Sequence, residues 1–244
     1  MLKTLLFDLD GTLLPVDTDR FVNHYLKMLA KKIAPFTEPK HFICHLLKAT
    51  DVMIHHQNPN KTNQEVFWET FSPMIPCKSE TLTRVLNEFY ELDFPKLSFI
   101  LEESGLSVSY DILRCAFEKG YEVVIATNPI FPKVAVFDRL RWIGAHDFSF
   151  RLVTTYEIMS YSKPYKDYYF EILGMINRKP SECMMIGNDM DEDMVAGELG
   201  MGTFLVTDHL INRNNLDISV YQNGTLGHLK TYIGNLKNLK EETL

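Results

Sequence analysis

Two carboxylates two positions apart, Asp8 and Asp10, directly follow the short apolar segment that opens the chain. While strand geometry lasts, side chains two apart lie on the same side of the backbone, so these carboxylates should be neighbours. Neighbouring carboxylates repel each other, and a hard cation such as Mg²⁺ relieves the repulsion, because proteins hold it with carboxylates, water and substrate phosphate. The pair predicts phosphoryl transfer, in which Asp8 could attack phosphorus and Asp10 could protonate the leaving oxygen.

Further polar groups follow apolar segments later in the chain. Thr127 and Asn128 come after the apolar run at 122–126, and Lys163 stands just before a proline and a predicted helix. Ligands of a parallel sheet bind beyond the carboxyl ends of its strands, so we expect these groups to converge with Asp8. Thr127, Asn128 and Lys163 are therefore candidates to bind the phosphoryl oxygens, and the lysine could also stabilise charge in the transition state.

An acidic run follows the apolar segment at 183–186 and supplies candidate metal ligands. Asp189 and Asp193 lie in this run and could complete, from another strand, the metal site that Asp8 and Asp10 begin. Oxygen ligands of this type suit Mg²⁺. The sequence therefore predicts a magnesium site at the same edge of the sheet.

The elements that must position these groups follow from the alternation of apolar runs and amphipathic segments. Strands are expected at 2–7, 122–126, 151–155, 183–186 and 203–206. Helices are expected between and after them at 108–119, 133–143, 165–176, 191–199 and 228–236. Strands that alternate with helices imply βαβ units, so the predicted fold is α/β, with a Rossmann-like, mostly parallel sheet flanked by helices.

A long region without a strand signal separates the first two predicted strands. Its apolar spacing predicts helices at 18–34, 41–54, 63–71 and 79–92, punctuated by prolines. We expect residues 15–104 to form an α-helical cap domain inserted into a core domain of residues 1–14 and 105–244. Such a cap should close over the strand ends, exclude water and supply substrate contacts.

Four segments of the chain resemble the motifs of the haloacid dehalogenase superfamily, in the order the family has them. Asp8-Leu9-Asp10-Gly11-Thr12 resembles the first motif, Thr127 in VIATN the second, Lys163 in SKPYKDYYF the third and the acidic run 187–193 the fourth. The resemblance implies Mg²⁺-dependent hydrolysis of phosphate esters, with Asp8 as nucleophile and Asp10 as acid and base. It also implies that the backbone carbonyl of Asp10 is a metal ligand.

The fourth motif departs from the usual family pattern, in which an aspartate directly follows the glycine. Asn188 occupies that position here. Asp189 with Asp193 fits one spacing found in the family, and Asn188 with Asp193 fits another. We favour Asp189 as the metal ligand because a carboxylate binds Mg²⁺ better than an amide, and keep Asn188 and Asp193 as further candidates.

The predicted function is a Mg²⁺-dependent phosphomonoester hydrolase that acts on a small phosphorylated metabolite through an aspartyl phosphate. A phosphomutase of the same superfamily would keep all these core residues and differ in how the cap holds the substrate. A haloacid dehalogenase is disfavoured, because that branch resembles Asp-x-x-Gly-Thr without the second aspartate. A catalytically silent binding protein is disfavoured because charges grouped this closely cost stability without a ligand.

The composition argues against other classes of partner. With 25 basic and 32 acidic side chains the formal net charge is -7, so the chain lacks a general basic footprint for nucleic acid. No stretch approaches the roughly 20 apolar residues of a membrane helix, and no signal peptide is visible. The four cysteines are scattered and form no CxxC pair. We expect a cytoplasmic protein with neither a nucleic-acid nor a membrane partner.

Overall fold

A parallel sheet forms the centre of the protein. The computed structural model describes residues 1–76 and 79–242, and its sheet has the strand order β3-β2-β1-β4-β5-β6. Every neighbouring pair of strands is parallel. The strands are β1 Thr4–Phe7, β2 Glu122–Ile125, β3 Leu152–Val153, β4 Cys183–Gly187, β5 Gly202–Val206 and β6 Asn223–Gly224. This arrangement confirms the predicted α/β class and Rossmann-like sheet.

Strand β1 occupies the middle of the sheet and is buried along its whole length. Its Leu6 lies level with Val124 of β2 and with Met185 of β4. From β1 the chain builds β2 and β3 on one side and then crosses to build β4, β5 and β6 on the other. The strand order therefore reverses beside β1, and ligands of open α/β sheets bind at such a switch point, beyond the carboxyl ends of the strands.

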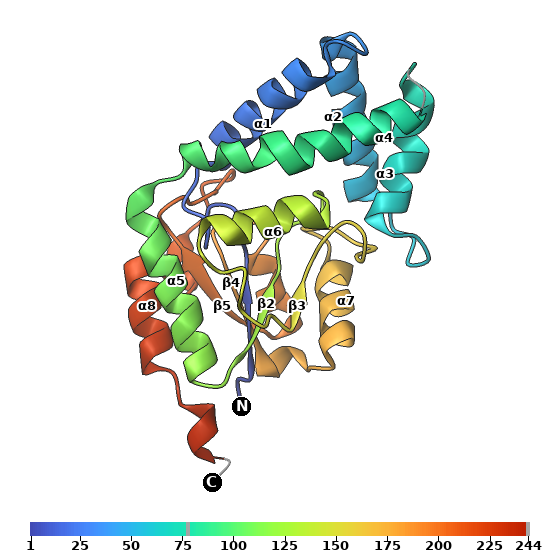
Figure 1. Ribbon diagram of the computed structural model, residues 1–244. Coiled ribbons are helices and arrows are strands. Elements are labelled where there is room, and N and C mark those ends of the chain that lie inside the picture. The colour runs from blue at the N-terminus through green and yellow to red at the C-terminus, as the bar shows by residue number, and fades with distance from the viewer. Residues whose placement is uncertain (77–78, 243–244) are drawn as a thin grey trace.

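Helices cover both faces of the sheet (Figure 1). The helices on the side of Leu5 and Phe7 are α5 Glu103–Glu118, α6 Lys133–Trp142 and α8 Leu226–Asn235, whose apolar residues share one cluster with those two side chains. Helix α7, Lys166–Ile176, packs on the opposite face with Leu6. Because β1 is covered on both faces, its side chains are all apolar or buried, as expected for a central parallel strand.

A bundle of helices lies beyond one edge of the sheet, in the upper part of Figure 1. Its helices are α1 Thr18–Ile33, α2 Pro39–His55, α3 Asn63–Phe71 and α4 Ser79–Glu88. Helix α1 begins where the Asp17 carboxylate accepts a hydrogen bond from the Arg20 backbone N–H at 2.7 Å. It buries Phe21, Tyr25 and Leu29, spaced by four, so that one face packs into the protein.

The helical segment leaves and rejoins the sheet-bearing part of the chain at one place. The backbone N–H of Glu102 donates to the carbonyl of Pro15 at 3.1 Å. Close by, a Cβ atom at Gly105 would lie 2.6 Å from Cβ of Pro15, so the two connections touch. An inserted domain requires its two connections to lie side by side, as they do here; we call this contact of Pro15 with Glu102 and Gly105 the joined root. The division into a core of residues 1–14 and 105–244 and a cap of residues 15–104 stays a prediction.

Phe94 links the helical bundle to the sheet-bearing part. It lies in a 3₁₀ segment, Phe94–Ile100, and stacks on Trp142 of α6 with ring centroids 5.5 Å apart. It also meets Phe21 of α1 edge-on at 6.1 Å and Phe131, in the loop after β2, at 6.3 Å. Aromatic packing from three parts of the chain therefore fixes where the bundle sits.

The structure differs from the sequence prediction at three places. The stretch expected at 79–92 is helical along its length, but it changes at Phe89 from α4 to a wider π-helical turn, Phe89–Asp93, before Pro95 restricts the backbone. The helix expected from residue 191 is a 3₁₀ segment, Met194–Leu199, which follows a turn whose backbone N–H groups at Asp191 and Glu192 bind the Asp189 carboxylate. Strand β6 was missed, since two residues leave no periodic signal.

No helix within the described residues combines the length and the apolar character that crossing a membrane needs. Cys44, Cys115 and Cys183 are free thiols, and Cys77 lies outside the described residues.

We predict that Phe94→Ala lowers the free energy of unfolding by about 3–5 kcal/mol, because it leaves a cavity at the junction of bundle and sheet. Phe99→Ala in the same segment is the matched control, since Phe99 is 62% exposed and should change stability by less than about 0.5 kcal/mol. Urea unfolding of both variants measures the difference. Equal losses for the two variants would contradict this account of the junction.

Candidate active site

Lys163 lies between two carboxylates at the carboxyl edge of the sheet. Its Nζ donates to Oδ1 of Asp8 at 2.7 Å and to Oδ1 of Asp193 at 2.6 Å, and the lysine side chain is 1% exposed. Burial alone would lower the pKa of Lys163, but the charges of Asp193 and Asp8 outweigh it and raise that pKa well above its usual value. The ammonium is therefore held charged beside Asp8.

Asp193 is fixed by its second oxygen and by a glycine. Its Oδ2 accepts a hydrogen bond from the Asp189 backbone N–H at 2.9 Å, and burial raises the pKa of Asp193 while Lys163 lowers it. A Cβ atom at Gly187 would lie 2.1 Å from that same Oδ2. The last residue of β4 must therefore be glycine for Asp193 to reach Lys163.

Thr12 and Asn188 lie against the other oxygen of Asp8. The Thr12 hydroxyl is 3.2 Å from Oδ2 of Asp8 and 2.9 Å from Oδ1 of Asn188, and it can donate to one of them at a time. Gly11 has φ +81°, and a Cβ there would lie 2.5 Å from the Asn188 amide nitrogen. That nitrogen donates to the His209 carbonyl at 2.6 Å, while the Asn188 oxygen faces the Thr12 hydroxyl.

Asp10 is paired with a fully buried arginine, Arg139 of α6. The Arg139 guanidinium lies over the ring of Phe131 at 4.6 Å and donates through Nε to the Ala135 carbonyl. Burial raises the pKa of Asp10, against the charge of Arg139, which lowers it. Oδ2 of Asp10 meets Arg139, whereas its buried Oδ1 has no hydrogen-bond partner among the described residues.

Asp189 caps its own loop and pairs with a more accessible arginine. Its Oδ1 accepts from the backbone N–H groups of Asp191 and Glu192 at 2.9 and 3.0 Å. Its Oδ2 accepts from Arg213 at 2.7 Å, and the arginine side chain is 54% exposed. In this structure both carboxylate oxygens of Asp189 therefore have partners.

Thr127 and Asn128 lie where the sequence predicts them, just past the end of β2. The Thr127 carbonyl accepts from the Thr154 hydroxyl at 2.7 Å and the Tyr168 hydroxyl at 2.9 Å, which fixes the backbone of this turn. The Asn128 amide donates to Glu192 at 3.1 Å, while its buried Oδ1 has no partner within the described part of the chain. Both residues face the same small cavity as Asp8.

That cavity has a volume of about 140 Å³, which suits a group the size of a phosphate with a few waters. Its lining includes most of the candidate residues, namely Asp8, Asp10, Thr127, Asn128, Asn188, Asp189 and Asp193. Lys163 contacts Asp8 at the side of this group. Seven of the eight candidate site residues therefore line one space, and Lys163 adjoins it through its contact with Asp8.

No three His, Cys, Asp or Glu side chains within residues 1–76 and 79–242 are grouped so that they could hold a metal ion. Two of the candidate carboxylates are instead paired with arginines, Asp10 with Arg139 and Asp189 with Arg213. The metal ligands suggested by the sequence therefore stay predictions.

Sequence reasoning missed the two arginines. Arg139 falls on the buried face of α6 with Ala135, Val136 and Leu140, and a charged residue on an apolar face is a signal that could have been read. Arg213 lies in a polar loop after β5, where no periodic pattern points to the site. Only the folded chain brings that loop to Asp189.

The chain is similar to hydrolases of one family. The model of the haloacid dehalogenase-like hydrolase family matches residues 2–199. A glyceraldehyde 3-phosphate phosphatase from Methanothermobacter thermautotrophicus is 26% identical over 243 residues, covering 90% of this chain and 95% of the relative. The pyrophosphatase PpaX from Anoxybacillus flavithermus is 24% identical over 197 residues, covering 81% of this chain and 79% of the relative.

A solved structure shares the fold. The crystal structure of a haloacid dehalogenase-type phosphatase from Thermococcus onnurineus superposes with a TM-score of 0.59 at 18% sequence identity. The match covers 98% of this chain and 100% of that one. At this identity the similarity supports the fold, and the match over nearly the whole length extends it to the helical bundle.

We predict that Arg139→Met lowers the free energy of unfolding by about 3–5 kcal/mol, because Asp10 loses the cation that offsets its burial. In an Asp10→Asn background the loss of unfolding free energy caused by Arg139→Met should be smaller, and the difference between the two losses should be about 1–3 kcal/mol. Denaturant unfolding of the four proteins of this double-mutant cycle measures the coupling. Arg114→Met, at a surface pair with 53% of the arginine exposed, is the control. An equal cost of Arg139→Met in both backgrounds would disprove the coupling.

Proposed function

The chain belongs to the haloacid dehalogenase-like hydrolase family and is a phosphatase of small phosphorylated substrates, and we propose that it works through an aspartyl phosphate on Asp8 with Mg²⁺ as cofactor. The observation that supports this most is the contact of Asp8 with the buried ammonium of Lys163, at the edge of a cavity of phosphate size. An ammonium in that position favours a negatively charged nucleophile and a negatively charged substrate at once.

The proposed reaction has two steps with balanced protons. The Asp8 carboxylate attacks phosphorus, the bond from phosphorus to the ester oxygen breaks, and Asp10 gives that oxygen a proton. Water then attacks the phosphorus of the aspartyl phosphate, gives a proton back to Asp10, and releases phosphate and the Asp8 carboxylate. The unpartnered Oδ1 of Asp10 is the atom available to carry this proton, while Arg139 holds Oδ2.

Thr127, Asn128 and Lys163 are the proposed binding groups for the phosphoryl oxygens. The Thr127 carbonyl is fixed by two hydrogen bonds, so its side chain and the next backbone N–H have defined positions at the cavity wall. Lys163 would stay in contact with Asp8 throughout, because Asp193 holds it from the other side. These residues would keep the substrate in line with Asp8.

The donor set fits Mg²⁺, which prefers oxygen ligands and keeps some of its waters. Asp8 and the backbone carbonyl of Asp10 are proposed ligands, and Mg²⁺ would offset the negative charge of the phosphate when bound. For the third ligand the contacts favour the Asn188 oxygen, because the Thr12 hydroxyl contacts both that oxygen and Oδ2 of Asp8. The Asp189 carboxylate could serve directly only after it exchanges Arg213 for the metal.

Residues 15–104 are proposed to act as a cap over this edge. Beyond the joined root, the bundle touches the core at the start of α3, where the Asn63 side chain donates to the Pro129 carbonyl at 3.2 Å and the Ser162 hydroxyl at 3.1 Å. Pro129 directly follows Asn128, and Ser162 directly precedes Lys163. The proposed cap therefore contacts the two segments that carry the phosphate-binding groups. The cytoplasmic location expected from the sequence stays a prediction.

We predict that Asp8→Asn lowers the rate of phosphate release by at least about a thousand-fold, because an amide cannot form the acyl phosphate. Removal of divalent metal with EDTA should abolish activity, and added Mg²⁺ should restore it. The measurement is phosphate release from p-nitrophenyl phosphate. Asp147→Asn, whose side chain is 90% exposed, should behave as wild type. Activity that persists in Asp8→Asn would rule out this nucleophile.

We predict that Asn188→Asp lowers the Mg²⁺ concentration needed for half-maximal activity by about ten-fold, because a carboxylate replaces an amide beside Asp8. Asp189→Asn should shift that concentration by less than about three-fold, since its carboxylate mainly caps the loop and pairs with Arg213. Titration of activity with MgCl₂ compares the two variants. A large rise in the Mg²⁺ requirement for Asp189→Asn alone would show that Asp189 is the ligand.

A further inference from the structure

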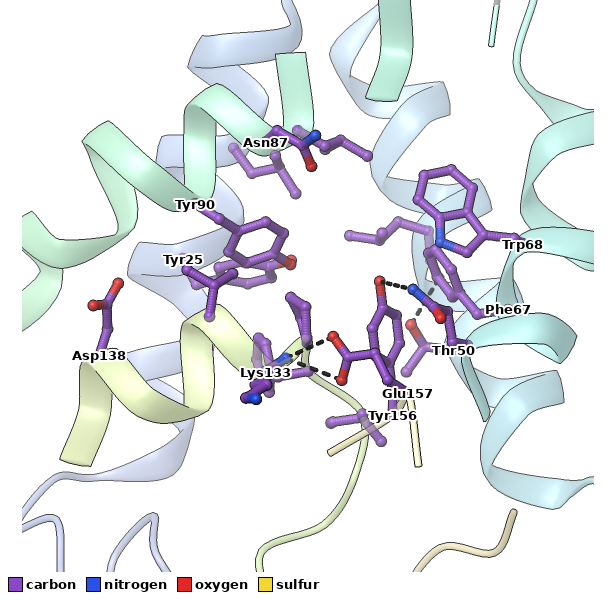
Figure 2. Close-up of a pocket in the computed structure, with 18 of the residues that line it drawn as sticks. Tyr25, Thr50, Phe67, Trp68, Asn87, Tyr90, Lys133, Asp138, Tyr156 and Glu157 are labelled. Carbon is purple, nitrogen blue, oxygen red and sulfur yellow. Dashed lines mark hydrogen bonds between the residues drawn. The ribbon is translucent and has the colours of Figure 1, made fainter. Parts of the chain in front are cut away.

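A second, larger cavity of about 630 Å³ lies between the helical bundle and α6. Figure 2 shows Tyr25 and Tyr90 on one side of it, Phe67, Trp68 and Tyr156 on the other, and Lys133 and Glu157 at its base. Its volume is in the range of cavities that bind drug-sized molecules. None of the residues assigned to the phosphoryl chemistry lines it, so it is free to hold another part of a substrate.

The two cavities share walls. Val22, Ile130 and Phe131 line both the small cavity that contains Asp8 and the large one. Phe131 is held in place by the Arg139 guanidinium over its ring, and Arg139 is in turn paired with Asp10. The two cavities are therefore adjacent, with these three side chains as their common wall, and a substrate that used both would have to reach past them.

The walls of the large cavity are mainly apolar and aromatic. They come from α1, α2, α3, α4 and α6 and include Leu26, Leu46, Phe67, Trp68, Leu86 and Phe137. Aromatic walls bury large apolar groups and favour edge or stacked contact with other rings. A sugar or triose chain carries a hydroxyl on nearly every carbon, and those hydroxyls that faced the apolar part of the walls would lack partners.

Seven of the eleven polar side chains in the lining are neutral, and several of these bond to one another. The Tyr25 and Tyr90 hydroxyls bond to each other at 3.0 Å, and Gln64 donates to the Tyr156 hydroxyl at 3.4 Å. Burial raises the pKa of Tyr25 to about 12, so this hydroxyl stays uncharged at neutral pH. The tyrosine pair uses one of its two protons internally and can offer the other to a single oxygen of a ligand.

The charged residues in the lining cancel. Arg141 pairs with Asp138, the Lys133 ammonium lies over the Phe137 ring at 5.4 Å, and Glu157 accepts from the Lys133 backbone N–H at 2.8 Å. Two cations and two anions give this cavity no net charge with which to attract a second phosphate or a carboxylate. The second anionic group of a bisphosphate or of pyrophosphate would find one ammonium here, that of Lys133, with the Glu157 carboxylate in the same lining.

We propose that the substrate is a phosphomonoester of an uncharged, largely apolar alcohol that carries an aromatic or similarly bulky group and at most one further oxygen function. This inference rests on the proposed function, because it assigns the phosphate to the cavity of Asp8. The organic group then fills the large cavity, with its oxygen, where it has one, at the Tyr25 and Tyr90 hydroxyls.

The test compares esters whose leaving alcohols are equally reactive, so that only binding in the cavity differs. Purified protein with saturating Mg²⁺ is assayed for phosphate release from 4-phenylbutyl phosphate, n-propyl phosphate and glycerol 3-phosphate, all primary alkyl esters. We expect kcat/KM for 4-phenylbutyl phosphate to exceed that for either small ester by at least about 100-fold, since each methylene buried in an apolar pocket contributes about ten-fold or more.

A variant that fills the cavity provides the second readout. Thr50→Trp projects an indole from α2 into the space, and we expect it to lower the ratio of kcat/KM for 4-phenylbutyl over n-propyl phosphate by at least about ten-fold. Thr231→Trp, at an exposed position of α8, is the matched control and should keep the wild-type ratio. Because the readout is a ratio of two substrates in one protein, partial loss of folded protein does not affect it.

The outcomes separate this inference from the function on which it rests. Hydrolysis that is equal for all three esters, or faster for glycerol 3-phosphate, would overturn the apolar substrate and leave the phosphatase intact. A wild-type preference that Thr50→Trp does not reduce would overturn the assignment of this cavity. Failure to hydrolyse any of the esters, with Mg²⁺ present, would overturn the proposed function and this inference with it.

Discussion

The buried contact of Lys163 with Asp8 and Asp193 is the interaction on which the site depends. A lone charge removed from water costs several kcal/mol, and even a pair is stable only when both partners are held in good geometry. Here the three groups come from separate parts of the chain, after β1, before α7 and after β4. The strand order that places β1 beside β4 is therefore what lets the charges meet, and Gly187 provides the space that Asp193 needs.

The same requirement explains the two arginines. Asp10 and Asp189 lie at the cavity beside Asp8, and each has a guanidinium as its counter-charge. Arg139 is fully buried and its guanidinium lies over the Phe131 ring, so its pair with Asp10 is a fixed part of the core. Arg213 is about half exposed, so its pair with Asp189 is weaker and can exchange. The site therefore combines one permanent charge pair with one that a metal or substrate could replace.

Much of this could be predicted from the sequence, because the relevant signals are local. Apolar runs that end in Asp8, Thr127 and Gly187 predicted the strands and the edge at which their side chains meet. Asn63–Phe71 was predicted to the residue from its apolar spacing, and in the structure Thr62 and Glu65 form a capping box at its start. Contacts between side chains from distant segments could not be predicted. The pairing of Asp10 with Arg139, and the choice between Asn188 and Asp189, depend on side-chain directions that spacing alone does not give.

The large cavity shows the same limit. Its residues come from five helices, two loops and the π-helical turn that carries Tyr90, and the apolar ones look like ordinary core residues in their own segments. Phe67 and Trp68 lie on the predicted helix 63–71, and the sequence favours bundle packing for them. Only when α3 faces α1, α4 and α6 does a space remain between them. Helix packing leaves such a space where facing residues do not interdigitate, and sequence periodicity carries no information about it.

The covalent step at Asp8 is the claim on which this account stands, and it can be tested by trapping. The wild-type protein is mixed with substrate and Mg²⁺, quenched in acid within milliseconds, reduced with borohydride and analysed by peptide mass spectrometry. An aspartyl phosphate at Asp8 predicts conversion of that residue to homoserine, dependent on substrate and on Mg²⁺. Unmodified Asp8 under conditions of rapid turnover, or homoserine at another aspartate such as Asp10 or Asp189, would contradict the account.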